Sequence, residues 1–331
     1  MLLDIRNLTI STETANGKVS VLDKVNLQIS EGEIHTLVGE SGSGKSLIAR
    51  AIMGFLSNRW HVQADRLWFE DTDLLNLTPK QRREIIGVDI AMIFQDAKSY
   101  LDPNLTIGEQ LKQAVLDQDL SGSFWQRRKE RQQKVESLLH RVGIKEHDAI
   151  LNSYSYELSE GAAQKIMIAS AIAHRPKLLI ADEPTSTMEP ATRQQIYRLL
   201  AQFHARYGMS ILMISQDLGA IMQQTERLTM IYSGQVMENG SAEQLLHAPQ
   251  HPYTEALLDT SLYRHAKMQP RNHLPTLAGA EPTLQHLPVG CRLGPRCSYA
   301  RPACVKTPAL QKYRGTQYAC HFPLRIEEDE S

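Results

Sequence analysis

The stretch Gly39-Glu40-Ser41-Gly42-Ser43-Gly44-Lys45-Ser46 decides the fold of this chain. It matches the phosphate-binding loop pattern G-x-x-x-x-G-K-[ST]. Glycine is needed there because a tight loop must turn its backbone N–H groups inward, where a Cβ would obstruct them. Those N–H groups and a following helix N-terminus bind anionic phosphates. We expect Lys45 to reach the β- and γ-phosphates of a nucleotide, and the Ser46 hydroxyl to coordinate Mg²⁺.

The residues on either side of this loop support the match. Residues 33–38 have the pattern of a strand, and after the loop the apolar residues Leu47, Ile48, Ala51 and Ile52 recur at helical spacing. A strand, a glycine loop and a helix, in that order, are what a phosphate-binding loop requires. The alternative is a glycine-rich turn that fits the pattern by chance, and the downstream half of the site weighs against it.

Composition limits the class of protein. The chain has 331 residues, of which 42% are hydrophobic and 22% charged, as is typical of a soluble globular protein. Its formal net charge of -1 creates no strong field that would attract nucleic acid or lipid. No apolar run approaches the ~18–20 residues of a membrane helix, and the N-terminus lacks the basic region of a secretory signal. We expect a cytosolic protein that reaches a membrane only by docking on partners.

The order of predicted elements indicates an α/β fold. Residues 1–30 alternate like a small antiparallel sheet, with Asn16-Gly17 as a hairpin turn signal. Buried strands are predicted near residues 90–94, 177–181 and 210–214, with helices between and after them. Strands that alternate with helices favour a mainly parallel sheet. We therefore predict a domain over residues 1–245 with a helical subdomain at about 98–175, and a small cysteine-containing extension over residues 246–331.

Two carboxylates, Asp182 and Glu183, follow the apolar run at residues 177–181. Beside a nucleotide, the first can hold Mg²⁺ directly or through water, and the second can polarise the attacking water as a general base. Alone, an apolar strand that ends in two acids is more often a solvated strand end. The phosphate-binding loop upstream in the same predicted domain favours the functional interpretation.

Five segments occur in the following order along the chain: residues 39–46, Gln95, Leu158-Ser159-Glu160-Gly161, Asp182-Glu183-Pro184-Thr185 and Ile214-Ser215-Gln216-Asp217-Leu218. They resemble the Walker A, Q-loop, signature, Walker B and switch segments of ABC-transporter ATPases, and the resemblance covers about residues 1–245. It implies that two such subunits sandwich two ATP molecules head to tail, so that the signature of one completes the site of the other.

The resemblance also implies roles for individual residues. ATP would contact all eight residues of the Walker A loop, together with Gln95, Ser159 and Gly161. Mg²⁺ would be held by Ser46, Gln95 and Asp182. Hydrolysis would depend on Glu183 and on Gln216 at the switch position.

A narrower resemblance involves the Q-loop region and the C-terminal third. Phe94-Gln95-Asp96, Ser99-Tyr100-Leu101-Asp102-Pro103, His251-Pro252-Tyr253-Thr254 and the region from Gly290 to Cys320 resemble the oligopeptide and dipeptide importers. This implies a peripheral protein on the cytoplasmic face of a Gram-negative inner membrane, taking part in uptake of peptides, antimicrobial ones included. Its partners would be two permease subunits, a second ATPase subunit and, indirectly, a periplasmic peptide-binding protein. The same resemblance and the near-neutral charge oppose an ABC ATPase that acts on nucleic acid.

Three departures from the ABC pattern favour a weakened site. The signature usually reads L-S-G-G-Q, but Glu160 puts a carboxylate where glycine is expected. Gln216 stands where the switch histidine is usual, and it brings neither a titratable proton nor a positive charge. Glu189 replaces the usual D-loop aspartate. We predict Mg-ATP binding with slowed hydrolysis, the partner ATPase carrying more of the turnover. The alternative is a regulatory subunit of an uptake system that uses ATP mainly as a switch.

All four cysteines lie in the C-terminal extension, at Cys291, Cys297, Cys304 and Cys320. Four thiolates can hold Zn²⁺ or an iron–sulfur cluster. The spacing lacks the C-x₂-C pairs of many zinc sites, which favours a [4Fe–4S] cluster over Zn²⁺. The importer resemblance points the same way. Four reduced structural thiols are the remaining alternative.

Overall fold

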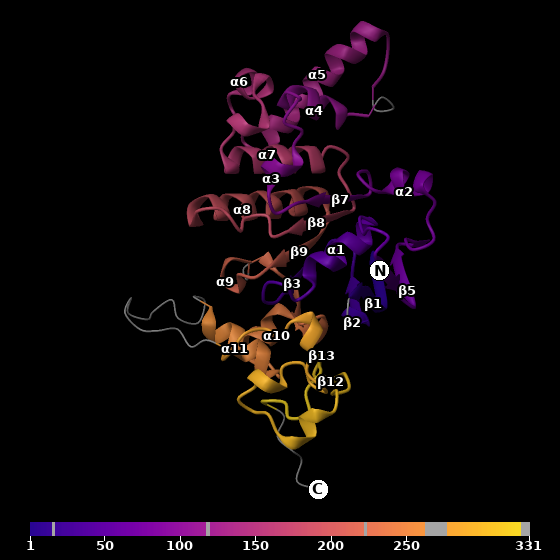
Figure 1. The fold of residues 1–331 in the computed structure, drawn as a ribbon. Coiled ribbons are helices and arrows are strands. Elements are labelled where there is room, and N and C mark those ends of the chain that lie inside the picture. Colours follow the sequence, from indigo (N-terminus) through magenta and orange to yellow (C-terminus); the bar gives the residue numbers. More distant parts are fainter. Residues whose placement is uncertain (15–16, 117–119, 222–223, 262–276, 326–331) are drawn as a thin grey trace. The chain divides into compact units, whose positions relative to one another are not determined.

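The computed structural model describes residues 1–14, 17–116, 120–221, 224–261 and 277–325 (Figure 1). These residues form two compact units: Met1–Leu77 with Leu212–Ser331, and Thr78–Ile211. The division leaves the C-terminal extension in the same unit as the phosphate loop. Asn16, the first residue of the predicted hairpin turn, lies outside the described residues.

An antiparallel sheet opens the first unit, as predicted. Strand β1 (Leu3–Thr14) pairs with β2 (Gly17–Ile29), and its register shifts between Ile5 and Leu8 and again before Ser11. The same strand pairs on its other side with β4 (Trp60–Gln63) and β5 (Arg66–Phe69), and β5 pairs with β6 (Thr72–Asp73). Sequence analysis missed β4 to β6 because these strands have only two to four residues, too few to show a clear alternation.

The phosphate loop follows β3 (Ile34–Val38), whose five residues are all buried. Strand β3 pairs in parallel with β10 (Arg227–Tyr232), which forms a hairpin with β11 (Gln235–Ser241). Strand β11 continues into the antiparallel pair β13 (Thr316–Tyr318) and β12 (Gln311–Tyr313). The C-terminal extension therefore adds two strands to the sheet that carries the loop.

The helices of the first unit are short. Helix α1 (Lys45–Met53) starts inside the phosphate loop, and α9 (Leu218–Ile221) follows the switch position. Helices α10 (Ala242–His247) and α11 (Pro252–Thr260) come after β11. The described part of the extension also contains the 3₁₀-helical turns η4 (Leu284–His286), η5 (Gly294–Arg296) and η6 (Pro302–Val305).

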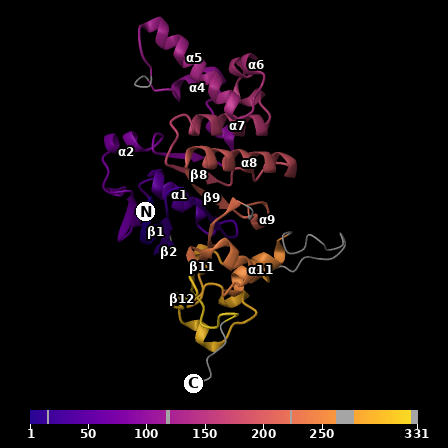
Figure 2. The same ribbon diagram turned by 180° about the vertical axis from the view of Figure 1, so that it is seen from behind.

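The second unit pairs β7 (Ile90–Ile93) in parallel with β8 (Leu178–Asp182), two fully buried strands that the apolar runs predicted. A cluster of helices lies between them in the sequence (Figure 2). Among the described residues of this unit are the helices α2 (Pro79–Ile85), α3 (Ala97–Tyr100), α4 (Ile107–Gln113), α5 (Phe124–Arg141), α6 (His147–Asn152), η2 (Ser155–Glu157), α7 (Glu160–Ala171) and α8 (Pro190–Tyr207). Strand β9 (Ser210–Ser215), all buried, crosses from this unit into the first. No helix in the described ranges is both long and apolar enough to cross a membrane.

Buried polar contacts anchor the start of the extension to β11. Glu238 is fully buried and accepts hydrogen bonds from the backbone N–H of Gln250 (2.7 Å) and of His251 (3.1 Å). The His251 ring caps α11, because its Nδ1 accepts from the Tyr253 N–H at 3.0 Å. His251 itself is 1% exposed, and burial lowers its pKa to about 4.

We predict that the His251 cap makes stability fall in mild acid. The folded-state pKa of about 4 lies below the ordinary value of 6.5, so the unfolded chain binds more protons between these pH values. The stabilisation is complete above pH ~6.5 and is lost as the pH falls toward 4. Between pH 7 and 4, the free energy of unfolding of wild type should drop by roughly 3 kcal/mol more than that of His251→Asn, which keeps a capping side chain. Urea unfolding at several pH values measures this, and parallel pH profiles for the two proteins would contradict it.

Candidate active site

Steric confinement fixes the shape of the phosphate loop. Gly42 and Gly44 have φ angles of 88° and 100°, in the left-handed region that favours glycine. A Cβ on Gly39 would lie 2.1 Å from the Ile231 carbonyl oxygen, and one on Gly44 would lie 2.4 Å from a methyl of Leu22. The glycines that the motif requires are thus needed here both for conformation and for space.

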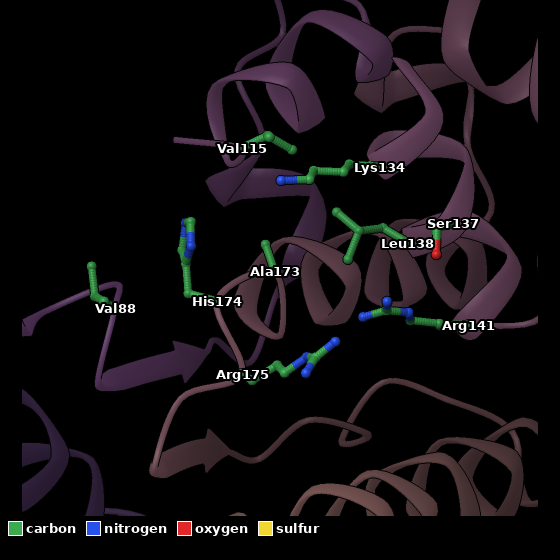
Figure 3. Close-up of a pocket in the computed structure, with 9 residues that line it drawn as sticks. All are labelled: Val88, Val115, Lys134, Ser137, Leu138, Arg141, Ala173, His174 and Arg175. Atoms are coloured by element: carbon green, nitrogen blue, oxygen red, sulfur yellow. The ribbon is translucent and has the colours of Figure 1, made fainter. Parts of the chain in front are cut away.

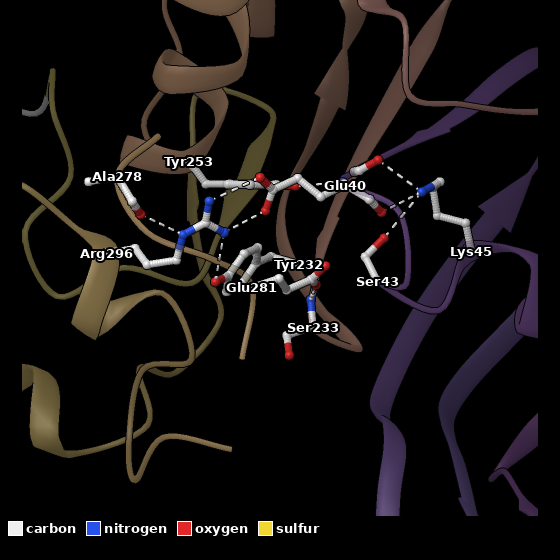
Figure 4. Close-up of polar contacts among 10 residues, drawn as sticks. Glu40, Ser43, Lys45, Tyr232, Ser233, Tyr253, Ala278, Glu281 and Arg296 are labelled. Carbon is white, nitrogen blue, oxygen red and sulfur yellow. Dashed lines mark hydrogen bonds and ion pairs between the residues drawn. The ribbon is translucent and has the colours of Figure 1, made fainter. Parts of the chain in front are cut away.

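Lys45 closes the loop on itself. Its side chain is buried, and its Nζ donates to the carbonyl oxygens of Gly39 and Glu40, each at 2.8 Å, and to Ser43 Oγ at 3.3 Å (Figure 4). The ammonium is therefore held over the loop by neutral acceptors, which phosphate oxygens can replace. Ser46 lies in the first turn of the nine-residue helix α1, whose N-terminus favours negative charge. The loop fits the triphosphate of a nucleotide.

In the second unit, Gln95 and Glu183 lie together although 88 positions separate them. Gln95 Nε2 donates to Glu183 Oε2 at 3.3 Å. Asp182 is the buried last residue of β8. The next residue, Glu183, has a backbone φ of 45°, which is unusual for any residue other than glycine. Such a conformation is sparsely populated and tends to occur at functional sites. The strand end thus presents two carboxylates in different surroundings, one buried and one partly exposed.

The signature segment starts a helix. Ser159 is the N-cap of α7, and its Oγ accepts from the Ala162 N–H at 3.2 Å. Glu160 is exposed in the first turn of α7, where a carboxylate is favourable beside the positive end of the helix dipole. A Cβ on Gly161 would come within 3.1 Å of a methyl of Thr192, which is a tight contact. In the described chain the Glu160 side chain therefore faces solvent.

The predicted site residues are distributed over the two units. The phosphate loop and Gln216, which is exposed directly after β9, belong to the first unit. Gln95, Ser159, Gly161, Asp182 and Glu183 belong to the second. Within each unit the structure brings together the groups described above: Lys45 with its loop in the first, and Gln95 with Glu183 in the second.

The four cysteines do not form a metal-binding group. Cys291, Cys297, Cys304 and Cys320 are all free thiols, buried or half-buried. Burial raises the pKa of Cys291 and Cys297, and raises that of Cys320 to about 11, with smaller contributions from the neighbouring cysteines. Yet within residues 1–14, 17–116, 120–221, 224–261 and 277–325, no three His, Cys, Asp or Glu side chains are placed to hold one metal ion. The geometry therefore does not support the predicted iron–sulfur cluster, or zinc, as the thiols stand.

Sequence analysis missed the groups that surround Glu40 of the phosphate loop. Arg296, Tyr253 and Glu281 come from the C-terminal extension and lie more than 200 positions away in the chain, yet they line one side of the loop (Figure 4). No local pattern signals such contacts, because they depend on how the extension packs on β10 and β11.

A separate hollow of about 420 Å³ lies among the helices of the second unit (Figure 3). Lys134 and Arg141 reach it from α5, and His174 and Arg175 from the turn after α7. Figure 3 shows the guanidinium groups of Arg141 and Arg175 directed toward one another. None of the predicted site residues lines this hollow.

Two family models match the chain. The model for ABC transporters matches residues 22–186, and the model for the oligopeptide/dipeptide transporter C-terminal region matches residues 237–304. The first covers the phosphate loop, Gln95, the signature and Asp182-Glu183. The second covers Tyr253, Arg296 and three of the four cysteines.

Two known transport proteins are similar to this chain over nearly its whole length, and a solved structure is similar to most of it. The peptide transport system ATP-binding protein SapD of Salmonella typhimurium is 48% identical over 99% of both chains. The dipeptide transport ATP-binding protein DppD of Escherichia coli is 38% identical over 98% of this chain and 97% of its own. A solved dimeric bacterial ABC transporter cassette superposes with a TM-score of 0.63 and 23% identity, over 72% of this chain and 98% of its own, which supports the fold.

These similarities confirm the resemblance to ABC-transporter ATPases and, within them, to the oligopeptide and dipeptide transporters, with SapD among the relatives that match over the full length. They also confirm the α/β ATPase fold with its antiparallel N-terminal sheet and helical cluster. The chain belongs to the ABC-transporter ATP-binding proteins, in the branch that carries the oligopeptide/dipeptide transporter C-terminal region.

Proposed function

We propose that this chain is the ATP-binding subunit of a peptide importer at the cytoplasmic face of a bacterial inner membrane. Its partners are two permease subunits and a second ATPase subunit, with a periplasmic peptide-binding protein acting through the permeases. The observation that carries the proposal is the phosphate loop closed by Lys45, in a chain whose full-length relatives are named as peptide transport proteins. The ATPase domain spans residues 1–245, its helical subdomain about 98–175, and the extension residues 246–331.

The proposed chemistry gives each predicted site residue a role. The loop and Lys45 hold the β- and γ-phosphates, and Ser46, Gln95 and Asp182 are the groups for Mg²⁺, which neutralises charge on the phosphates when bound. Glu183 accepts the proton of the water that attacks the γ-phosphorus, and ADP leaves. The hydrogen bond from Gln95 orients the Glu183 carboxylate. ATP binding closes two ATPase subunits head to tail, with Ser159 and Gly161 of this chain facing the partner's nucleotide, and closure opens the permease.

We further propose that hydrolysis at this site is slow. Gln216 can donate a hydrogen bond to the γ-phosphate but supplies no positive charge, in contrast to the usual histidine. Glu160 is exposed at the start of α7, where a facing triphosphate would meet its carboxylate. Glu189, also exposed, replaces a shorter acid just before α8. Each change weakens an interaction with the transferring phosphoryl group while leaving the phosphate loop unaltered.

A second candidate function is a nucleotide switch that hydrolyses ATP rarely and regulates assembly of an uptake system. Gln216 and Glu160 favour it. Glu183 opposes it, because a carboxylate held by Gln95 at the end of β8 is the general base that hydrolysis needs.

For the cysteines we propose a [4Fe–4S] cluster that fastens the extension rather than transferring electrons. Binding it would require the thiols to move from the positions described above, where no three of them are placed to hold one metal ion. Support comes from the chemistry of the donor set, which is four thiols that are all buried or half-buried. Ligation to iron would stabilise the thiolate forms of Cys291, Cys297 and Cys320, whose pKa values burial raises.

Single-turnover hydrolysis tests the transport function. We expect wild type to hydrolyse ATP slowly when alone and faster with its partner ATPase, and Glu183→Gln to abolish hydrolysis in both settings while ATP binding persists. Glu243→Gln, an exposed change on α10, is the matched control and should behave as wild type. If wild type binds ATP but is no faster than Glu183→Gln in either setting, the subunit is a switch instead.

Metal analysis of chain purified without oxygen tests the cluster. We expect about four iron atoms per chain with acid-labile sulfide and visible absorbance. Replacement of all four cysteines by serine should remove the iron, and replacement of the exposed Ser298 by alanine should not. Stoichiometric zinc would show the other metal, and metal-free wild type with unchanged thermal stability would leave four structural thiols.

A further inference from the structure

Arg296 in the extension forms a two-point ion pair with Glu40 of the phosphate loop. Its Nη1 and Nη2 donate to the two Glu40 carboxylate oxygens at 2.6 and 3.1 Å (Figure 4). The Arg296 side chain is 7% exposed and that of Glu40 is 29% exposed. Arg296 is itself oriented, because its Nε donates to the Ala278 carbonyl at 2.8 Å and Nη1 also donates to the Tyr232 hydroxyl at 3.2 Å. Bidentate pairs of this kind combine strength with a defined geometry.

The backbone of Glu40 is held by the same extension. Its N–H donates to the Tyr253 hydroxyl at 2.9 Å. Tyr253 is fully buried in α11, and its ring packs against Tyr232 with centroids 4.9 Å apart. Because this packing holds the Tyr253 ring in place, its hydroxyl fixes the position of the Glu40 backbone in the loop.

Glu40 therefore has a partner at each of its polar groups. Tyr253 takes the N–H, Arg296 takes the carboxylate, and Lys45 Nζ donates to the carbonyl oxygen at 2.8 Å. The position of Glu40 thus sets the place of one carbonyl oxygen that holds the Lys45 ammonium. Any shift of the extension at Arg296 is passed through one residue to the lysine that binds phosphate.

Glu281 of the extension binds the turn between β10 and β11 and also lies beside the loop. Glu281 accepts from the Ser233 N–H at 3.1 Å, and its Oε2 lies 3.8 Å from the position that a Cβ on Gly42 would take. Burial raises the pKa of Glu281, and the nearby Glu40 raises it further. Without Arg296, two neighbouring carboxylates would face the loop with less compensating charge, and both would repel a triphosphate.

We propose that the C-terminal extension positions the phosphate loop, with Arg296 and Tyr253 as positioning residues that act through Glu40. The proposal rests on the ATP-binding function given above and adds a linkage to it. Because coupling between two sites is reciprocal, ATP binding must stabilise the extension by as much as the extension strengthens ATP binding. The role of the oligopeptide-type extension is then to set the ATP affinity of the subunit.

A double-mutant cycle on ATP affinity tests the proposal. Arg296→Met should weaken ATP binding about tenfold in the otherwise wild-type chain, but less than about threefold when Glu40 is already Gln, since the pair is then absent. Arg296→Lys, which keeps the charge but not the fork, should fall between wild type and Arg296→Met. Arg301→Met, in the same extension and stacked over Phe322, should leave affinity unchanged.

Amide hydrogen exchange supplies a readout that needs no nucleotide. Arg296→Met should speed exchange across residues 39–46 without ATP, and saturating ATP should slow exchange across residues 277–300 in wild type. If wild type binds no ATP, the proposed function fails. The comparison of loop exchange between wild type and Arg296→Met without ATP still tests whether the extension positions the loop. The proposal is overturned if Arg296→Met, folded by its thermal unfolding curve, binds ATP within about twofold of wild type and leaves exchange in the loop unaltered.

Discussion

The close fit of the phosphate loop between β3 and β10 is the constraint on which the first unit depends. Five buried residues of β3 bring the chain to Gly39, where a methyl group would collide with the Ile231 carbonyl. The loop must then turn through left-handed glycines and be closed from above by the buried Lys45. A loop shaped in this way presents backbone N–H groups and one cation, which is what a triphosphate needs and little else could use.

The family relationship gives this loop its context, and the extension gives it a further support. In the second unit, Gln95 donates a hydrogen bond to Glu183, the proposed general base. Gln216 in the first unit and Glu160 in the second depart from the usual ABC pattern. Under the proposed function, one chain thus keeps ATP binding while its hydrolysis is slowed. Such a division suits a paired motor in which one subunit binds ATP to drive closure and the other does more of the hydrolysis.

Local sequence patterns predicted many of the strands and site residues, whereas the features that they missed depend on long-range packing. The phosphate loop, the buried strands at β7, β8 and β9 and the pair Asp182-Glu183 could be found because apolar runs and glycine spacing are written in consecutive residues. Strands β4 to β6, β12 and β13 have only two to four residues, too few to show a clear alternation. Of these, β4, β5 and β13 also pair with strands that are distant in the sequence. The same applies to Arg296, whose partner Glu40 is 256 positions away. Cysteine count and spacing suggested a cluster, but they do not fix where thiols point.

The measurement that tests the central claim most directly is an equilibrium titration of the full chain with ATP in the presence and absence of Mg²⁺, for wild type and Lys45→Ala. The account predicts one ATP per chain, tighter binding with Mg²⁺, and a loss of affinity of at least about tenfold in Lys45→Ala, because this change removes the buried ammonium that the loop holds. Binding that is equally tight without Lys45, or no binding by wild type, would contradict the account.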